Sequence, residues 1–96
     1  MSISKLKYED LTAIKNSIFS KFITTPSVKD ALFLILTNIQ AKHSKLRLKD
    51  ISFISDTNQD SNFFYVHLTY NSRIIKKVIA KKDLKNIEVI LLELLK

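Results

Sequence analysis

The sequence contains no glycine, and this absence excludes sites in which a bare backbone must come close to a ligand. Phosphate loops, dinucleotide fingerprints and nucleophile elbows all depend on glycine at such positions. The sequence also contains no cysteine, which excludes disulfides, thiolate catalysis and sulfur-based metal sites. The lack of cysteine favours an intracellular location, cytoplasmic or nuclear, and a host cell if the protein is viral.

Long apolar runs are missing as well. The longest, Ala31 to Leu36, is far shorter than the ~18 to 20 residues that a bilayer span requires. The segment Met1 to Asp10 lacks the apolar stretch of a secretory signal. We therefore expect a soluble protein with no membrane-spanning segment and no secretory signal.

Patterns typical of catalysis or metal binding are also missing. No serine or threonine has a recognisable base and orienting group, so we expect no enzymatic activity. His43 and His67 have no second histidine or acid pair at ligand spacing, and we interpret both as structural or solvated. Asp56 and Asp60 lack the further oxygen ligands of a calcium loop. The sequence predicts no metal site and no cofactor.

What the sequence does have is an excess of positive charge. Its 96 residues include 16 Lys and Arg against 9 Asp and Glu, a formal net charge of +7. Such a balance favours anionic partners, with nucleic acid first and acidic proteins or membrane surfaces after it. The length and the 46% hydrophobic content predict one folded domain over residues 1–96.

Two helices are expected in the first half of the chain. Leu11, Ile14, Ile18 and Phe22 recur at spacings of three and four, which predicts an amphipathic helix over residues 7–23. A second helix is expected over residues 26–42. Proline suits its first turn, and either Thr25 or Ser27 can cap it. The negative charge of Asp30 would interact favourably with the positive, N-terminal end of the helix dipole.

The second helix and the last helix carry more apolar surface than one sheet would hide. Phe33 and Leu34 widen the apolar stripe of the second helix, and Val89 and Leu92 lie outside that of the last helix. The simplest interpretation is that the N-terminal helix covers the excess. The alternative is a homodimer or a protein partner bound through these four residues.

The second half of the chain predicts an antiparallel meander and a closing helix. Strands are expected at Ile51 to Ser55, Phe63 to Tyr70 and Arg73 to Ala80, with a tight hairpin between the last two strands. A final helix follows over residues 82–95. The fold class is therefore α+β: an N-terminal helix, then α-β-β-β-α with a three-stranded antiparallel sheet packed against helices.

Aromatic residues gather on the middle strand. Phe63, Phe64, Tyr65 and Tyr70 could form a platform on which bases stack, as in single-strand binders. Side chains alternate between the two faces of a strand, so half of these rings must face the core. Core or hairpin packing is the interpretation we prefer.

From residue 26 onward the order of elements resembles a degenerate double-stranded RNA-binding domain to which residues 7–23 add a helix. The likeness depends on Ile51-Ser-Phe-Ile-Ser55 as first strand and Phe64-Tyr-Val-His-Leu68 as second. It depends above all on Lys81-Lys82-Asp83-Leu84-Lys85-Asn86, which is similar to the family's Lys-Lys-x-Ala-Lys element. The resemblance implies binding of duplex RNA across two minor grooves and the major groove between them, by shape and backbone contacts.

By the same resemblance, Lys81, Lys82 and Lys85 would grip phosphates at the start of the last helix, with help from Lys77. At spacings of i, i+1 and i+4 the first three would share one face of an α-helix's opening turn. Cations at a helix N-terminus oppose the dipole, so this is poor for helix stability and good for holding an anion.

The family's first helix also reaches a minor groove, and Thr37, Asn38 and Lys42 fall approximately at those positions. The loop of residues 56–62 has neither glycine, proline nor histidine, whereas the family carries a Gly-Pro-x-His element there. This departure favours an alternative, a protein-interaction or dimerisation module of the same fold with little RNA affinity. A further alternative is a small basic phage or viral inhibitor with an unrelated fold.

Overall fold

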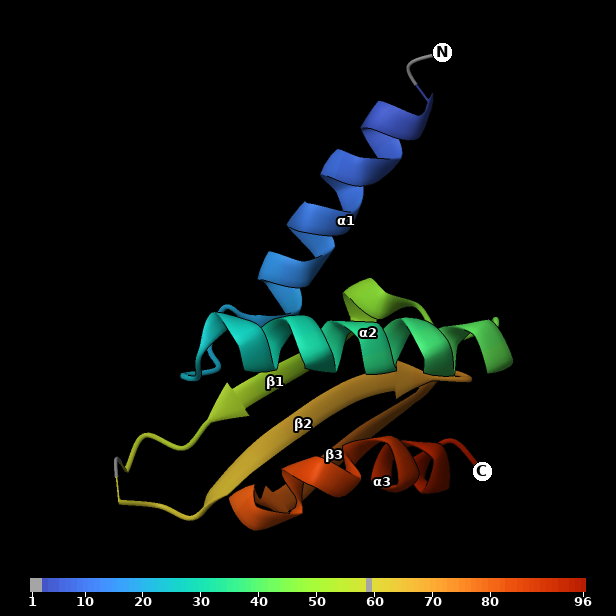
Figure 1. Cartoon of the computed structure of the whole chain (residues 1–96). Coiled ribbons are helices and arrows are strands. Elements are labelled where there is room, and N and C mark those ends of the chain that lie inside the picture. Colours follow the sequence, from blue (N-terminus) through green and yellow to red (C-terminus); the bar gives the residue numbers. More distant parts are fainter. Residues whose placement is uncertain (1–2, 59) are drawn as a thin grey trace.

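The computed structural model describes residues 3–58 and 60–96, with side chains for residues 11–58 and 60–96. It confirms the α+β class, with three α-helices and a three-stranded antiparallel sheet in the order β1-β2-β3 (Figure 1). The elements are α1 (Ile3–Phe19), α2 (Pro26–Lys42), η1 (Leu48–Asp50), β1 (Ile51–Ser55), β2 (Phe63–Tyr70), β3 (Arg73–Ala80), η2 (Lys81–Asn86) and α3 (Ile87–Leu94), where η marks a 3-10 helix.

The start of α2 is fixed by its cap, as expected. Thr25 is the N-cap, and its Oγ1 accepts a hydrogen bond from the backbone N–H of Val28 at 3.4 Å. Pro26 occupies the first helical position, where a missing N–H costs nothing. Asp30 forms an ion pair with Lys15 of α1, which links the two helices at this point.

The three strands have the expected bounds. β1 pairs with β2 so that Phe53 lies opposite Val66, and β2 pairs with β3 so that Phe64 lies opposite Ile79. The β2–β3 hairpin turns through two residues with positive φ, Asn71 at 52° and Ser72 at 63°. Two successive left-handed residues define a type I′ turn, the geometry that matches strand twist. The sequence forms it without glycine.

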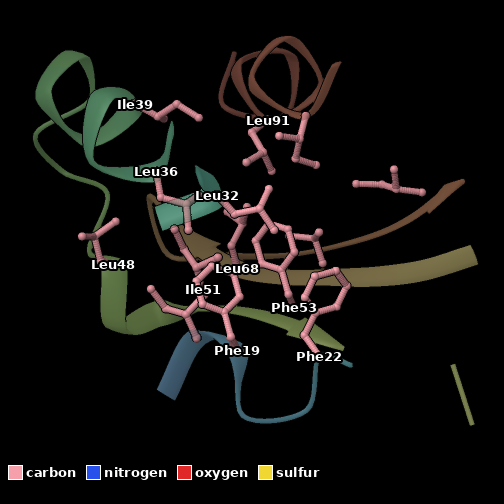
Figure 2. Close-up of a cluster of buried hydrophobic side chains, with 14 of the residues drawn as sticks. Phe19, Phe22, Leu32, Leu36, Ile39, Leu48, Ile51, Phe53, Leu68 and Leu91 are labelled. Atoms are coloured by element: carbon pink, nitrogen blue, oxygen red, sulfur yellow. The ribbon is translucent and has the colours of Figure 1, made fainter. Parts of the chain in front are cut away.

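One face of the sheet carries the core. Phe64, Val66 and Leu68 alternate along β2 toward this face and are buried. Side chains of α1, α2 and α3 pack against this same face of the sheet and complete the core (Figure 2). Four phenylalanines interlock near β1, with ring centroids 5.4 to 6.3 Å apart for Phe19, Phe22, Phe53 and Phe64. The helices α2 and α3 run in the same direction along the sheet (Figure 1).

The N-terminal helix lies earlier in the chain than expected. It spans Ile3–Phe19 rather than 7–23, and the chain leaves it through a turn at Ser20. Lys21 forms a parallel bridge with Ile54, and its carbonyl accepts a hydrogen bond from the Ser55 N–H at 2.9 Å. The segment after α1 thus pairs with the outer edge of β1 and satisfies backbone groups that an edge strand would otherwise leave unpaired.

The final helix also differs from the expectation. Residues Lys81–Asn86 form a 3-10 helix, and the α-helix begins only at Ile87. In a 3-10 helix the side chains at i and i+3 eclipse one another, which places Leu84 directly before Ile87 on the side that meets the core. Ile87, Leu91 and Leu95 are buried and form the face of this segment that meets the core.

Candidate nucleic-acid interface

The cations singled out from the sequence begin directly after β3. Lys81, Lys82 and Lys85 all lie on η2, and all three are exposed. Among the described side chains, none of the three forms an ion pair with a carboxylate. Three ammonium groups without a carboxylate partner in this part of the chain leave their positive field open to an anionic ligand.

The 3-10 geometry changes how these lysines are arranged. With three residues per turn, Lys82 and Lys85 point in the same direction, while Lys81 is rotated by about a third of a turn. The expectation of one shared α-helical face is therefore wrong for Lys81. The α-helix dipole does not act directly on this cluster either, because the α-helix begins at Ile87 and has Glu88 in its first turn.

Lys81 shares a surface hollow with a lysine that the sequence did not suggest. Lys21, in the segment after α1, lines this hollow of about 400 Å³ together with Lys81 and the start of the β1–β2 loop. Lys21 is exposed and forms no ion pair with a described carboxylate. No local pattern identifies it, since only the pairing of residue 21 with the edge of β1 places it here. We call Lys21, Lys81, Lys82 and Lys85 the lysine ridge.

A second hollow joins the lysine ridge to the sheet. Lys81 and Lys82 line it with Asn62, Phe63 and Ala80, and its volume is about 450 Å³. The backbone N–H of Lys81 donates to the carbonyl of Asn62 at 2.7 Å, which fixes the start of η2 to the residue just before β2. Lys81, Lys82 and Phe63 thus line one hollow.

Lys85 reaches the helical side of the molecule. It lines a groove with Leu84 and residues from the first half of α2, among them Ser27 and Ala31. This contact follows from the parallel course of α2 and α3, which brings their N-terminal ends to the same end of the molecule (Figure 1). The lysine ridge therefore extends from the edge of β1 to the helical side of the molecule.

The remaining predicted RNA-binding residues are not brought to the ridge. Asn38 and Lys42 are exposed in the second half of α2, where Lys42 is the last residue, and neither lines the groove that Lys85 shares with this helix. Thr37 is half-buried, and its hydroxyl donates to the carbonyl of Leu34 at 2.7 Å. Lys77 is exposed on β3 opposite Val66, on the helix-covered face of this edge strand.

One carboxylate lies close to the ridge. Asp56 lines the same hollow as Lys21 and Lys81. The pKa of Asp56 is lowered, first by a hydrogen bond from the Ser61 side chain and then by the backbone N–H of Asn58. The carboxylate is therefore ionised at neutral pH, where it offsets part of the positive charge of this hollow.

The apolar helix surface is only partly covered. Phe33 and Leu92 are half-buried against the core, whereas Leu34 is 63% and Val89 62% exposed. The helix α1 packs against β1 and η1 and meets α2 at the Lys15–Asp30 ion pair. Complete covering of this surface by the N-terminal helix, the simplest interpretation of the sequence, is therefore wrong for Leu34 and Val89.

The described residues include neither a membrane-spanning helix nor a metal-binding cluster. No helix in residues 3–58 and 60–96 has the length and apolar character to cross a membrane. The same residues contain no group of three acidic or histidine side chains placed to hold a metal ion. Comparisons with protein-family models, curated proteins and solved structures found no significant match.

Proposed function

We propose that the protein binds double-stranded RNA without catalysing a reaction, and that the lysine ridge supplies the phosphate contacts. The observation that carries the proposal is the set of four exposed lysines that have no carboxylate partner among the described side chains. The order α2, β1 to β3 and α3, with lysines opening η2, is the order on which the resemblance to double-stranded RNA-binding domains depends, and it supports the proposal. Binding of this kind reads the shape of an A-form duplex rather than its sequence.

The physical basis is the release of counterions from the RNA backbone. If three or four lysines displace counterions, the logarithm of the affinity should fall with the logarithm of the salt concentration, with a slope of roughly −2 to −4. Lys77, on β3, would add to the positive field of the lysine ridge. Thr37, Asn38 and Lys42 remain a prediction for a second contact farther along α2, separate from the ridge.

The test is a titration of duplex RNA, single-stranded RNA and duplex DNA at two salt concentrations. Lys82→Ala/Lys85→Ala should weaken binding to duplex RNA and reduce the magnitude of the salt slope by about two, one for each phosphate contact. Lys45→Ala/Lys49→Ala removes the same charge from exposed residues outside the ridge and should have a smaller effect. Equal losses in the two variants, or no preference of the wild type for duplex RNA, would contradict the proposal.

A second candidate function is a protein-interaction or dimerisation module, and the exposure of Leu34 and Val89 favours it. Both side chains lie on the helices that cover the sheet, so one partner could contact both. Sedimentation of the wild type and of Leu34→Glu/Val89→Glu separates the candidates. A dimer that the double substitution dissociates, in a protein without duplex-RNA affinity, would favour this second function.

A further inference from the structure

The face of the sheet opposite the helices is open. The period of two along the strands and the register assign to it Ser52, Ile54, Phe63, Tyr65, His67, Thr69, Ile74, Lys76, Val78 and Ala80. None of these residues is buried, and Ile74, Val78 and Phe63 are 74%, 56% and 48% exposed. We call this surface the open face.

The central strand carries three aromatic rings along the open face. Phe63, Tyr65 and His67 are two residues apart, so their Cα atoms are spaced by about 7 Å. In the part of the chain that the structure describes, none of the three rings contacts another ring. The rings of Phe64 and Tyr70, on the same strand, point to the other face, where Phe64 is buried and Tyr70 contacts His43.

This arrangement revises the interpretation of the aromatic strand. The sequence analysis preferred core or hairpin packing to a stacking platform, and such packing holds for Phe64 and for the hairpin residue Tyr70. Phe63 and Tyr65 lie instead on the open face, with Phe63 in the hollow that Lys81 and Lys82 line. Aromatic rings beside cations are the two components of a surface that binds single-stranded nucleic acid.

The charge of the open face indicates what covers it. Its outward residues include Lys76, opposite His67, and no aspartate or glutamate. The two lysines at the Phe63 end extend the positive field along the strand. A second copy of this chain would bring the same positive charge to the interface, whereas a polyanion is complementary to it.

We propose that the open face binds unpaired nucleotides, with bases stacked on Phe63, Tyr65 and His67 and the backbone held by Lys76, Lys81 and Lys82. Tyr65 is the central ring, in a row between Ile54 and Val78. The site accepts up to three bases, one for each ring. Because Lys81 and Lys82 also belong to the lysine ridge, a duplex held there could pass a single-stranded extension onto the sheet.

The test compares two tyrosines of the same strand. Tyr65→Leu removes a ring from the open face and Tyr70→Leu removes one from the opposite face, while both keep an apolar side chain. The ligands are a fluorescein-labelled oligouridine, a blunt RNA duplex, and that duplex with a single-stranded extension that contains 2-aminopurine. Fluorescence anisotropy gives the affinities, and quenching of 2-aminopurine reports stacking of the extension.

The proposal expects Tyr65→Leu to weaken binding of oligouridine by about 5- to 100-fold and to abolish the quenching. Tyr70→Leu should retain both, and Tyr65→Phe, which restores the ring, should do so too. Circular dichroism of each variant confirms that it is folded. Unchanged oligouridine affinity in folded Tyr65→Leu overturns the proposal, as does a wild-type dimer that Val78→Lys dissociates, because the open face would then bind a second copy.

The inference depends on the proposed function only for the backbone contacts of Lys81 and Lys82. Loss of oligouridine binding in Tyr65→Leu, together with a blunt duplex that does not bind to the wild type, would leave the open face as the nucleic-acid site and refute duplex recognition. Normal binding of the blunt duplex with no effect of Tyr65→Leu on any ligand would refute the open face alone.

Discussion

Lys21 and Lys81 line one hollow at the edge of the sheet although they are far apart in the sequence. Lys21 is placed by its parallel bridge to Ile54 on β1, and Lys81 by its hydrogen bond to the Asn62 carbonyl just before β2. Both positions are therefore fixed by backbone pairing with the sheet, not by mobile loops. Two ammonium groups held in this way repel each other, and a bound phosphate would relieve that repulsion.

The first prediction follows from this pair. Lys21→Gln should weaken binding to duplex RNA and reduce the magnitude of the salt slope by about one, because one phosphate contact is lost. The measurement is a salt titration of affinity. Lys45→Gln is the matched control, since Lys45 is exposed and lies outside both hollows of the ridge. Equal slopes for the two variants would exclude Lys21 from the interface.

Asp56 provides the opposite test. Asp56→Asn removes a negative charge from the Lys21–Lys81 hollow while it retains an oxygen that accepts hydrogen bonds. Affinity for duplex RNA at neutral pH should rise by about two- to threefold, as expected for one exposed charge in water. Asp60→Asn is the control, because Asp60 is exposed in the same loop but does not line this hollow. A weaker complex for Asp56→Asn would contradict the prediction.

The pH dependence of the β1–β2 loop has a definite sign. Hydrogen bonds from Ser61 and Asn58 hold the pKa of Asp56 below its ordinary value of 3.8. Its contribution to loop order is therefore present above the ordinary carboxyl range and is lost as the pH falls through the lowered folded pKa. We expect the amide resonances of Asn58 and Ser61 to stay unchanged from pH 7 to about 5 and to shift only in stronger acid. A shift centred above the ordinary carboxyl range would contradict the lowered pKa.

Much of the fold could be predicted because local signals agree. Thr25 and Pro26 define the start of α2, alternation defines β2, and Asn71-Ser72 marks the hairpin. Both errors concern segments that continue an apolar helical period. Residues 20–23 continue that of α1, but the backbone pairing of Lys21 with β1 decides their conformation. Residues 81–86 continue that of α3, and the hydrogen bond from the Lys81 N–H to the Asn62 carbonyl holds the start of this segment beside the sheet. Such pairing is not encoded in a local window.

The candidate site was predictable to the same extent. The lysines of η2 form a local cluster, so composition alone identifies them. Lys21 is not part of any cluster, and its place in the lysine ridge depends on a tertiary pairing. Likewise, alternation along β2 predicts that half of its rings face outward. It does not predict that this face is left uncovered, which the structure shows because none of the open-face residues is buried.

The hairpin gives a stability prediction. Ser72 has a φ of 63°, which costs a residue with a Cβ about 1 kcal/mol relative to glycine. Ser72→Gly removes this cost, while the added freedom of the unfolded chain offsets about half of it, so the protein should be stabilised by about 0.5 kcal/mol and the Tm should rise by about 2 to 4 °C. Ser44→Gly is the matched control. Ser44 is exposed in a turn without positive φ, so glycine there should only add entropy to the unfolded chain and destabilise. A lower Tm for Ser72→Gly in a thermal melt would contradict this account.

The segment after α1 gives a prediction in which two adjacent residues differ. Phe22 is buried, with its ring centroid 5.5 Å from that of Phe53 and 5.4 Å from that of Phe64, whereas Ile23 is 85% exposed. Phe22→Ala leaves a cavity in this cluster and should reduce the free energy of unfolding by about 3 to 5 kcal/mol. Ile23→Ala should change it by less than about 0.5 kcal/mol, as for other surface positions. Urea denaturation followed by circular dichroism measures both values. Comparable losses would mean that α1 continues through residue 23 and that Lys21 is not held at the edge of β1, which would also remove it from the lysine ridge.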